Sequence, residues 1–332
     1  MLCRAEELRT LALRALVGGG VDPGDAAMVV DALLEAELRG RPTHGFIRLP
    51  GIRERFANRG PTVVTVVGDG GPWLHLDGGE GLGYVAAQRA TDEARERAAK
   101  HGLALVGVRR ATHAGMLGYY TAQLAEAGLV AMMLANCVAM VAPCGATSAV
   151  LGTNPVCVAF PHEPFPVLID MGTSAATFGD VLVALQQEKL LPEGVAFDAS
   201  GRPTRDPKGA REGALRTFGG HRGSALALAV QLLTGALVGA EPLPRPGVDY
   251  GLWLLAIDPG VFGPKEEFRR GVDAVVQAVK SARPEAGVTE VLVPGERAWR
   301  DRERRLREGL DLPDPLFHHL TRLAADARSS PG

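Results

Sequence analysis

The segment Leu-Val-Ala-Met-Met-Leu-Ala at residues 129–135 begins a series of short apolar runs in the middle of the chain. Three more follow, at residues 149–151, 156–160 and 166–170, and turn-forming residues separate them, as is typical of short strands. Few helical segments lie between these runs, so the regular strand–helix alternation of a doubly wound sheet is missing. Nor does any G-x-G-x-x-G motif follow a strand. The sequence therefore predicts an α/β protein without a classical Rossmann phosphate loop.

Outward from this region, apolar periodicity predicts helices at both ends of the chain. Helices are expected at residues 6–16, 23–39, 83–100, 224–238, 266–281 and 300–310, and further strands at 62–68, 73–77, 103–108, 252–257 and 288–293. The helix at 224–238 carries almost no charge, which predicts burial. Residues 191–212 are polar and rich in Pro, Gly and Asp, which predicts an exposed excursion. Gly18-Gly19-Gly20 lacks a preceding strand and is interpreted as a helix stop rather than a phosphate loop.

The composition is that of an ordinary globular protein. Hydrophobic residues make up 46% of the 332 residues and charged residues 22%, which excludes a disordered chain. A net charge of −2 gives no reason to expect nucleic acid or a membrane surface as partner. The four cysteines show neither zinc-ligand nor disulfide spacing. We expect no metal, no signal peptide and a cytoplasmic location.

One short segment, Thr-His-Gly-Phe-Ile-Arg-Leu-Pro at residues 43–50, pairs an imidazole with a permanent cation. His44 can transfer a proton near neutral pH, and the Arg48 guanidinium can bind a carboxylate through two parallel hydrogen bonds. Pro50 disfavours helical geometry at Leu49, so we expect the pair on one face of a single closed-off turn. A capped surface turn is the alternative interpretation of this segment alone.

Five further segments combine glycine with polar side chains, at residues 112–120, 151–155, 169–180, 219–224 and 293–297. Glycine allows a backbone to approach a ligand closely, and the free N–H groups of 219–224 together with Arg222 suit a phosphate. Any one of these segments could be only a turn, a helix cap or a linker. Together they favour a buried ligand site.

Across these six motifs, in the same order and over residues 6–310, the chain resembles the malate/L-lactate dehydrogenase family. This family also holds ureidoglycolate and sulfolactate dehydrogenases and the cyclic ketimine reductases, and it is distinct from the Rossmann-type malate and lactate dehydrogenases. The resemblance implies a homodimeric α/β protein built around a mixed sheet, with its own type of NAD(P)-binding fold. It also implies a cofactor, NADPH favoured over NADH, in a cleft between domains, and a small carboxylate-bearing substrate.

The resemblance further implies roles for individual residues. His44 would be the proton donor, with Asp180 and Thr43 in a relay, and Arg48 the ligand of the substrate carboxylate. Thr153, Phe178 and Gly179 would lie at the substrate. The residues implied to line the cofactor are His113, Ala114, Gly115, Met116, Leu117, Asp170, Met171, Gly172, Arg222, Pro294, Gly295, Glu296 and Arg297.

The prediction of the substrate rests on fewer residues. Phe178-Gly179-Asp180-Val181 and residues 220–226 are similar to the reductases of Δ1-piperideine-2-carboxylate and Δ1-pyrroline-2-carboxylate, so reduction of such a C=N bond is expected. Three positions depart from that pattern: Thr43 replaces a serine, Arg222 replaces a lysine, and Cys144 replaces a larger side chain. These departures leave cofactor preference and pocket size open.

Two alternatives remain beside the ketimine reductase. One is a 2-hydroxyacid dehydrogenase acting on malate, L-lactate, sulfolactate or ureidoglycolate, and the other is a cofactor-binding protein without catalysis. For domains, we expect residues 1–70 to form a helical segment packing with 298–332. Residues 71–120 with 282–297 would form a substrate and dimerisation region, and 121–281 the NAD(P)-binding domain.

Overall fold

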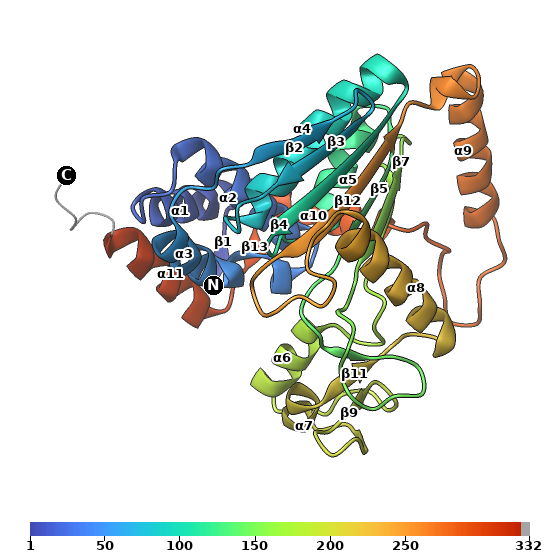
Figure 1. Cartoon of the computed structure of the whole chain (residues 1–332). Helices are drawn as coiled ribbons and strands as arrows, with labels where there is room; N and C mark the ends of the chain where they lie inside the picture. Colours follow the sequence, from blue (N-terminus) through green and yellow to red (C-terminus); the bar gives the residue numbers. More distant parts are fainter. Residues whose placement is uncertain (327–332) are drawn as a thin grey trace.

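A seven-stranded sheet forms the centre of the computed structural model, which describes residues 1–326 (Figure 1). Its spatial order is β2-β3-β4-β12-β5-β7-β8. The strands are β2 (Thr65–Asp69), β3 (Trp73–Asp77), β4 (Leu103–Ala111), β12 (Tyr250–Ile257), β5 (Val130–Ala135), β7 (Val156–Phe160) and β8 (Val167–Met171). β3 and β4 are parallel and the other neighbours antiparallel. The predicted mixed sheet in an α/β protein is confirmed.

Helices cover both faces of this sheet. Successive side chains of each strand point to opposite faces, so each strand contributes apolar residues to the cores on both sides. In β5, Ala131 and Met133 belong to the core beneath α4 (Gly83–His101) and α5 (Leu117–Glu126). Leu134, on the opposite face, packs with Val230 of α8 (His221–Gln231). α4 presents buried alanines to the sheet, which lets the helix lie close to it. Figure 1 shows α8 on the other side of the sheet from α4.

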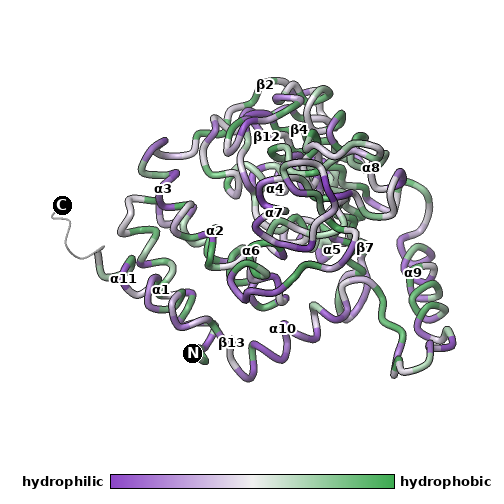
Figure 2. The backbone as a smooth tube through the Cα atoms, turned by 90° about the horizontal axis from the view of Figure 1, so that it is seen from below, coloured by the Kyte–Doolittle hydropathy of each residue, from purple (hydrophilic) through white to green (hydrophobic). Residues whose placement is uncertain are grey.

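The two ends of the chain pack together in a helical layer. α1 (Ala5–Val17), α2 (Pro23–Leu38) and α3 (Leu49–Arg59) share a hydrophobic core with α11 (Asp314–Asp326). β1 (Leu2–Cys3) pairs with β13 (Leu310–Asp311). α10 (Glu296–Glu308) runs along the edge of the molecule towards β13 and is hydrophilic over most of its length (Figure 2). Of the range 298–332 expected to pack here, residues 327–332 lie outside the described part.

A smaller lobe hangs below the main sheet in Figure 1. Its four strands run in the order β10-β9-β11-β6. They are β6 (Val141–Ala142), β9 (Ala196–Phe197), β10 (Pro203–Thr204) and β11 (Ala214–Arg216), with α6 (Phe178–Gln186) and α7 (Pro207–Glu212) beside them. The expected excursion at 191–212 therefore contributes two strands and a helix to this lobe.

The main sheet crosses the domain boundary expected between residues 120 and 121. β12 lies between β4 and β5 and pairs with both along most of its length. Strands from both sides of the boundary thus share one hydrogen-bonded sheet. The smaller lobe, by contrast, has its own apolar core around Val141, Val181 and Leu215.

Several predicted elements were wrong. Residues 288–293 form no strand, and at 149–151 only Leu151 makes an isolated bridge, to Val141. The helix predicted at 224–238 is not fully buried: α8 continues as a π-helix, η3 (Leu232–Leu237), and both expose leucines. Absence of charge predicted burial here, but Leu228, Leu232 and Leu237 are exposed.

α9 (Lys265–Lys280) stands apart from the body of the molecule in both views (Figures 1 and 2). Within residues 1–326, no helix combines the length and the apolar character that crossing a membrane would require.

Candidate active site

His44 and Arg48 lie on two successive 3-10 turns rather than on the single turn expected. The turns are η1 (Pro42–His44) and η2 (Phe46–Arg48), separated by Gly45. A β-carbon at Gly45 would collide with the carboxylate of Glu37, and that carboxylate accepts the Phe46 N–H at 2.9 Å. The buried Glu37 of α2 therefore determines where the chain bends between the two turns.

Pro50 does not end this segment but lies in the first turn of α3, which corrects the expected role. Leu49 is αR, with φ −58° and ψ −41°, in spite of the proline that follows it. The missing N–H of Pro50 costs little because the first N–H groups of a helix have no intrahelical acceptor. Arg48 is thus the residue that immediately precedes α3.

Thr43, His44, Arg48 and His113 meet at one place. The Thr43 hydroxyl lies 3.2 Å from Nδ1 of His44. The Arg48 Nε–H donates to the Thr43 carbonyl at 2.6 Å, which fixes the side chain and leaves both terminal nitrogens of the guanidinium available. The rings of His44 and His113 stack with centroids 5.8 Å apart. The structure therefore brings the first and second predicted motifs together.

Both imidazoles favour their neutral form. Burial lowers the pKa of His44 to about 4, and the Arg48 and Arg41 cations add to this effect. Desolvation lowers the pKa of His113 as well, followed by the charges of Arg48 and His44. His113 keeps an exposed surface, so water offsets part of its lowering. A neutral imidazole can accept a proton, and an anion on Arg48 would remove one cause of the lowering at His44.

A cavity of about 170 Å³ opens beside this cluster. Its lining combines arginine, tyrosine and histidine with glycine: Arg48, Gly51, Ile52, Arg55, Leu82, Gly83, Tyr84, Thr112, His113, Gly247 and Tyr250. The Tyr84 hydroxyl is buried and has no hydrogen-bond partner among the described residues. Burial raises the pKa of Tyr84, which keeps its proton as a donor. No carboxylate lines the cavity, so it suits an anion.

α6 begins directly against Thr43. A β-carbon at Gly179 would lie 2.6 Å from Cβ and 2.9 Å from Oγ1 of Thr43. The Asp180 carboxylate is exposed and accepts the Thr177 N–H at 2.8 Å in a capping box. Among the described residues, Asp180 and His44 form no hydrogen bond with each other. Gly179 therefore lies against Thr43, one of the catalytic candidates, whereas Asp180 caps its own helix.

The other predicted segments assemble around the end of β8. Asp170 accepts the Gly118 N–H at 2.9 Å, and burial is the main cause that raises the pKa of this carboxyl. The Thr153 carbonyl accepts both the N–H and the hydroxyl of Thr173. Met171 is exposed, and Gly172 lies close to the Thr153 carbonyl. Residues 113–118, 153 and 170–173 are thus neighbours in space.

The glycine-rich turn joins the same region. Phe218 N–H donates to the Thr173 carbonyl at 3.1 Å, and Gly219 and Gly220 have φ of +54° and +61°. A β-carbon at either glycine would meet no atom within 4 Å, so the turn faces open space at the N-terminus of α8. Arg222 is exposed there. Cys144 is exposed nearby, and its N–H donates to the Ser224 hydroxyl.

Residues 293–297 also lie against β8. The Leu168 N–H donates to the Pro294 carbonyl at 3.1 Å, and Gly295 lies against Leu168. Glu296 is buried and forms ion pairs with Lys280 and Arg300, while Arg297 is exposed. The Glu296 carboxylate is therefore engaged within the protein.

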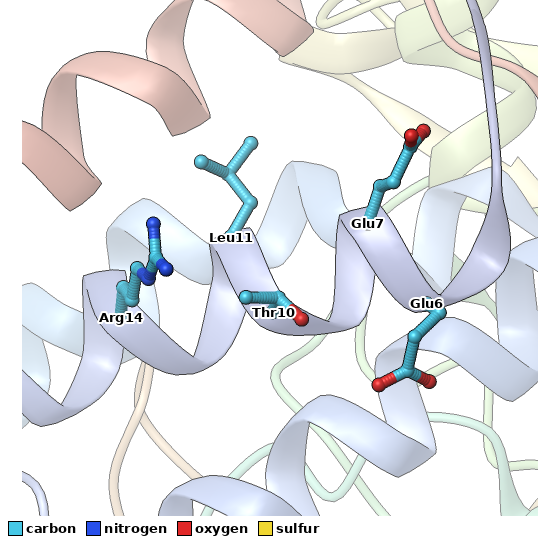
Figure 3. Close-up of a pocket in the computed structure, with 5 residues that line it drawn as sticks. All are labelled: Glu6, Glu7, Thr10, Leu11 and Arg14. Atoms are coloured by element: carbon cyan, nitrogen blue, oxygen red, sulfur yellow. The ribbon is translucent and has the colours of Figure 1, made fainter.

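Sequence reasoning missed Glu37, Arg55, Tyr84 and Tyr250, because none lies in a recognisable motif and only the tertiary fold brings them here. A second hollow, lined by Glu6, Glu7, Thr10, Leu11 and Arg14, lies along α1. In Figure 3 the carboxylates of Glu6 and Glu7 point away from each other, so these two charges do not converge on one ligand. Residues 1–326 hold no cluster of three or more His, Cys, Asp or Glu side chains suited to a metal ion.

Comparison with known proteins gives this site its context. The malate/(S)-sulfolactate dehydrogenase of Methanothermus fervidus is 33% identical over 340 residues, which cover 98% of this chain and 97% of that relative. The Δ1-pyrroline-2-carboxylate/Δ1-piperideine-2-carboxylate reductase of Pseudomonas syringae pv. tomato is 30% identical, covering 96% and 95%. The solved structure of sulfolactate dehydrogenase from Methanocaldococcus jannaschii matches with a TM-score of 0.90 and 31% identity, over 99% of this chain and 98% of that one.

The family model described as malate/L-lactate dehydrogenase matches residues 3–321. These matches extend over almost the whole length of the chain and of its relatives, and the relatives are named as dehydrogenases and reductases. The chain is an oxidoreductase of the malate/L-lactate dehydrogenase family.

Proposed function

We propose that the protein interconverts a 2-hydroxy acid and a 2-oxo acid, using a nicotinamide cofactor. The observation that carries this proposal is Arg48, whose terminal nitrogens are available beside the neutral imidazole of His44 at a cavity without carboxylates. A carboxylate bound to Arg48 would hold the neighbouring carbon near His44. In oxidation, C2 loses a hydride and its hydroxyl loses a proton; reduction returns both.

His44 is the proposed carrier of that proton. Its lowered pKa favours the neutral form, which can accept the hydroxyl proton during oxidation. The substrate carboxylate would offset the charge of Arg48, one of the causes of that lowering, and so favour protonation of His44 once substrate is bound. The Thr43 hydroxyl at Nδ1 holds the ring, while the stacked His113 covers one side.

The family implies a nicotinamide cofactor, and the residues present fit one. Gly219 and Gly220 face open space at the start of α8, where free N–H groups and Arg222 suit phosphate. We propose that residues 113–117, Asp170, Met171, Gly172 and residues 294–297 line the rest of the site. The bound cofactor would accept or supply the hydride. NADPH remains the proposed preference, and Arg222 is the cation proposed to favour it.

Reduction of a cyclic ketimine is the second candidate. It is supported by the start of α6, where Gly179 packs directly against Thr43, the residue before His44. Against it, the Asp180 carboxylate accepts the Thr177 N–H in a capping box, although the ketimine hypothesis needs it at His44. The relative named as a ketimine reductase is 30% identical, and the malate/(S)-sulfolactate dehydrogenase 33%.

Parallel assays with NADH and NADPH test this proposal. Pyruvate, oxaloacetate, Δ1-piperideine-2-carboxylate and Δ1-pyrroline-2-carboxylate would each be mixed with enzyme, and consumption of the reduced cofactor followed. Turnover of a 2-oxo acid is expected. Turnover of the cyclic imines alone would overturn the proposal in favour of the second candidate.

The exposed leucines 228, 232 and 237 support the further expectation of a homodimer, which light scattering of the purified protein tests.

A further inference from the structure

Arg48, which immediately precedes α3, and three residues of α3 line the cavity beside His44 in a row. The row consists of Arg48, Gly51, Ile52 and Arg55. The spacing of three, four and seven residues puts all of them on one face of the helix. Gly51 has no atom within 4 Å of the position of a β-carbon, so it leaves open space between the two arginines. Seven residues correspond to roughly 10 Å along the helix axis, a separation that leaves room for a small ligand between two long arginine side chains.

Arg55, like Arg48, is anchored by a backbone carbonyl, although through a terminal nitrogen instead of Nε. One terminal nitrogen donates to the Glu80 carbonyl at 3.0 Å, which fixes the side chain. The carboxylate of Glu80 instead pairs with Arg59. Within residues 1–326, no carboxylate lies within 4.0 Å of the Arg55 or the Arg48 guanidinium. Each arginine therefore keeps donors at the cavity, and a half-buried cation that contacts no carboxylate attracts an anion.

Two tyrosines of the cavity lining add donors to these cations. Tyr84 is 2% exposed and lines the cavity, and its buried hydroxyl lacks any hydrogen-bond partner among the described residues. The Tyr250 hydroxyl accepts the Gly247 N–H at 3.0 Å and retains its own proton to donate. An unpartnered buried hydroxyl in a cavity with two cations indicates a ligand with several acceptor oxygens. At about 170 Å³ the cavity is smaller than pockets for drug-sized ligands, so the ligand is small.

We propose that Arg55 binds a second anionic group of the substrate, so that the enzyme selects 2-hydroxy and 2-oxo acids carrying two negative charges. Such substrates are short dicarboxylates. This inference rests on the proposed function, in which Arg48 binds the carboxylate next to the reacting carbon. Arg55 would then act on specificity alone, because it lies two helical turns from Arg48 and takes no part in proton transfer.

The test compares oxaloacetate, a dianion, with pyruvate, its monoanionic counterpart, in wild type, Arg55→Gln and Arg55→Lys. Loss of a charge-assisted contact should lower kcat/KM of Arg55→Gln for oxaloacetate by about 10- to 100-fold. The value for pyruvate should change by less than about threefold. Arg55→Lys should recover part of the loss. Arg53→Gln is the matched control, because Arg53 is on the same helix but donates to the Leu323 carbonyl, away from the cavity.

A binding measurement separates failure of this inference from failure of the proposed function. Malonate should raise the melting temperature of wild type more than acetate does at equal ionic strength, and Arg55→Gln should abolish that difference even if no 2-oxo acid turns over. Equal losses for oxaloacetate and pyruvate in Arg55→Gln would overturn the inference. So would an unchanged malonate effect in that variant.

Discussion

The imidazole rings of His44 and His113, which are 69 positions apart in the chain, stack 5.8 Å apart at an interplanar angle of 22°. Burial lowers the pKa of both rings, and the Arg48 charge lowers both further. Two neutral rings can lie face to face without repulsion, whereas two imidazolium ions could not. Because the Arg48 charge is one cause of the lowered pKa, the proton state of His44 depends on what binds to Arg48.

The pH dependence of turnover should follow from this. Because the pKa of free His44 is about 4, the protonated ring needed for reduction becomes rarer as pH rises. Between about pH 5 and 8, kcat/KM for reduction of a 2-oxo acid should therefore fall by about tenfold per pH unit. Oxidation of the 2-hydroxy acid needs the neutral ring and should show no such fall. A reduction profile that stays flat up to pH 7 would contradict the lowered pKa.

Arg48→Lys should weaken substrate binding although the charge is kept. Arg48 uses Nε to hold the Thr43 carbonyl and retains two terminal nitrogens for a carboxylate, and a lysine head cannot do both. We expect KM for the carboxylate substrate to rise by about tenfold or more, with a smaller change in kcat. Steady-state kinetics measures both. Arg53→Lys, outside the cavity, serves as control, and an unchanged KM in Arg48→Lys would argue against the carboxylate contact.

Gly179→Ala should disturb the site from α6. The new methyl group would collide with Thr43, which holds the His44 ring, so we expect kcat/KM to fall by about 10- to 100-fold. Thr43→Ser removes one of the clashing atoms and should recover part of that activity in the double variant. Gly271→Ala on α9, where a β-carbon meets nothing within 4 Å, should leave kinetics unchanged. A fully active Gly179→Ala would show that this close packing is unimportant.

Glu37 should make stability depend on pH. Burial raises the pKa of this carboxyl to about 7 from 4.5, so the folded state holds a proton that the unfolded state has lost. Its stabilising contribution is complete below about pH 4.5 and disappears as pH rises through 7, with an upper limit of about 3 kcal/mol.

Thermal unfolding of Glu37→Gln at pH 5 and pH 8 tests this. The variant should lose less stability than wild type on going from the lower to the higher pH, because glutamine does not ionise. Glu54→Gln, at an exposed position of α3, should follow wild type. Parallel curves for all three proteins would show that Glu37 is ionised throughout.

Local patterns predicted those elements whose neighbours reinforce the pattern. β7, at residues 156–160, was predicted with its observed bounds. Its apolar run does form a strand because β5 and β8 pair with it on either side. Residues 288–293 have the same β-branched character but no strand beside them to pair with, so they remain a loop. Propensity alone could not distinguish these two cases.

The site shows the same limit. His44, Arg48 and residues 113–117 belong to motifs that resemblance could identify. Glu37 and Arg55 belong to none, because they act through a bend at Gly45 and a face of α3 that exist only in the folded chain. Pro50 was expected to end a turn and instead begins the helix that carries Arg55, so one wrong boundary concealed the second cation.

The most direct test of the account is the kinetics of His44→Gln in both directions, measured together with binding of NADH and NADPH. Glutamine keeps a polar side chain but cannot carry the proton, so kcat should fall by about 10²–10⁴-fold while cofactor affinity stays unchanged. Wild-type turnover in His44→Gln would contradict the proton-transfer role and with it the central claim.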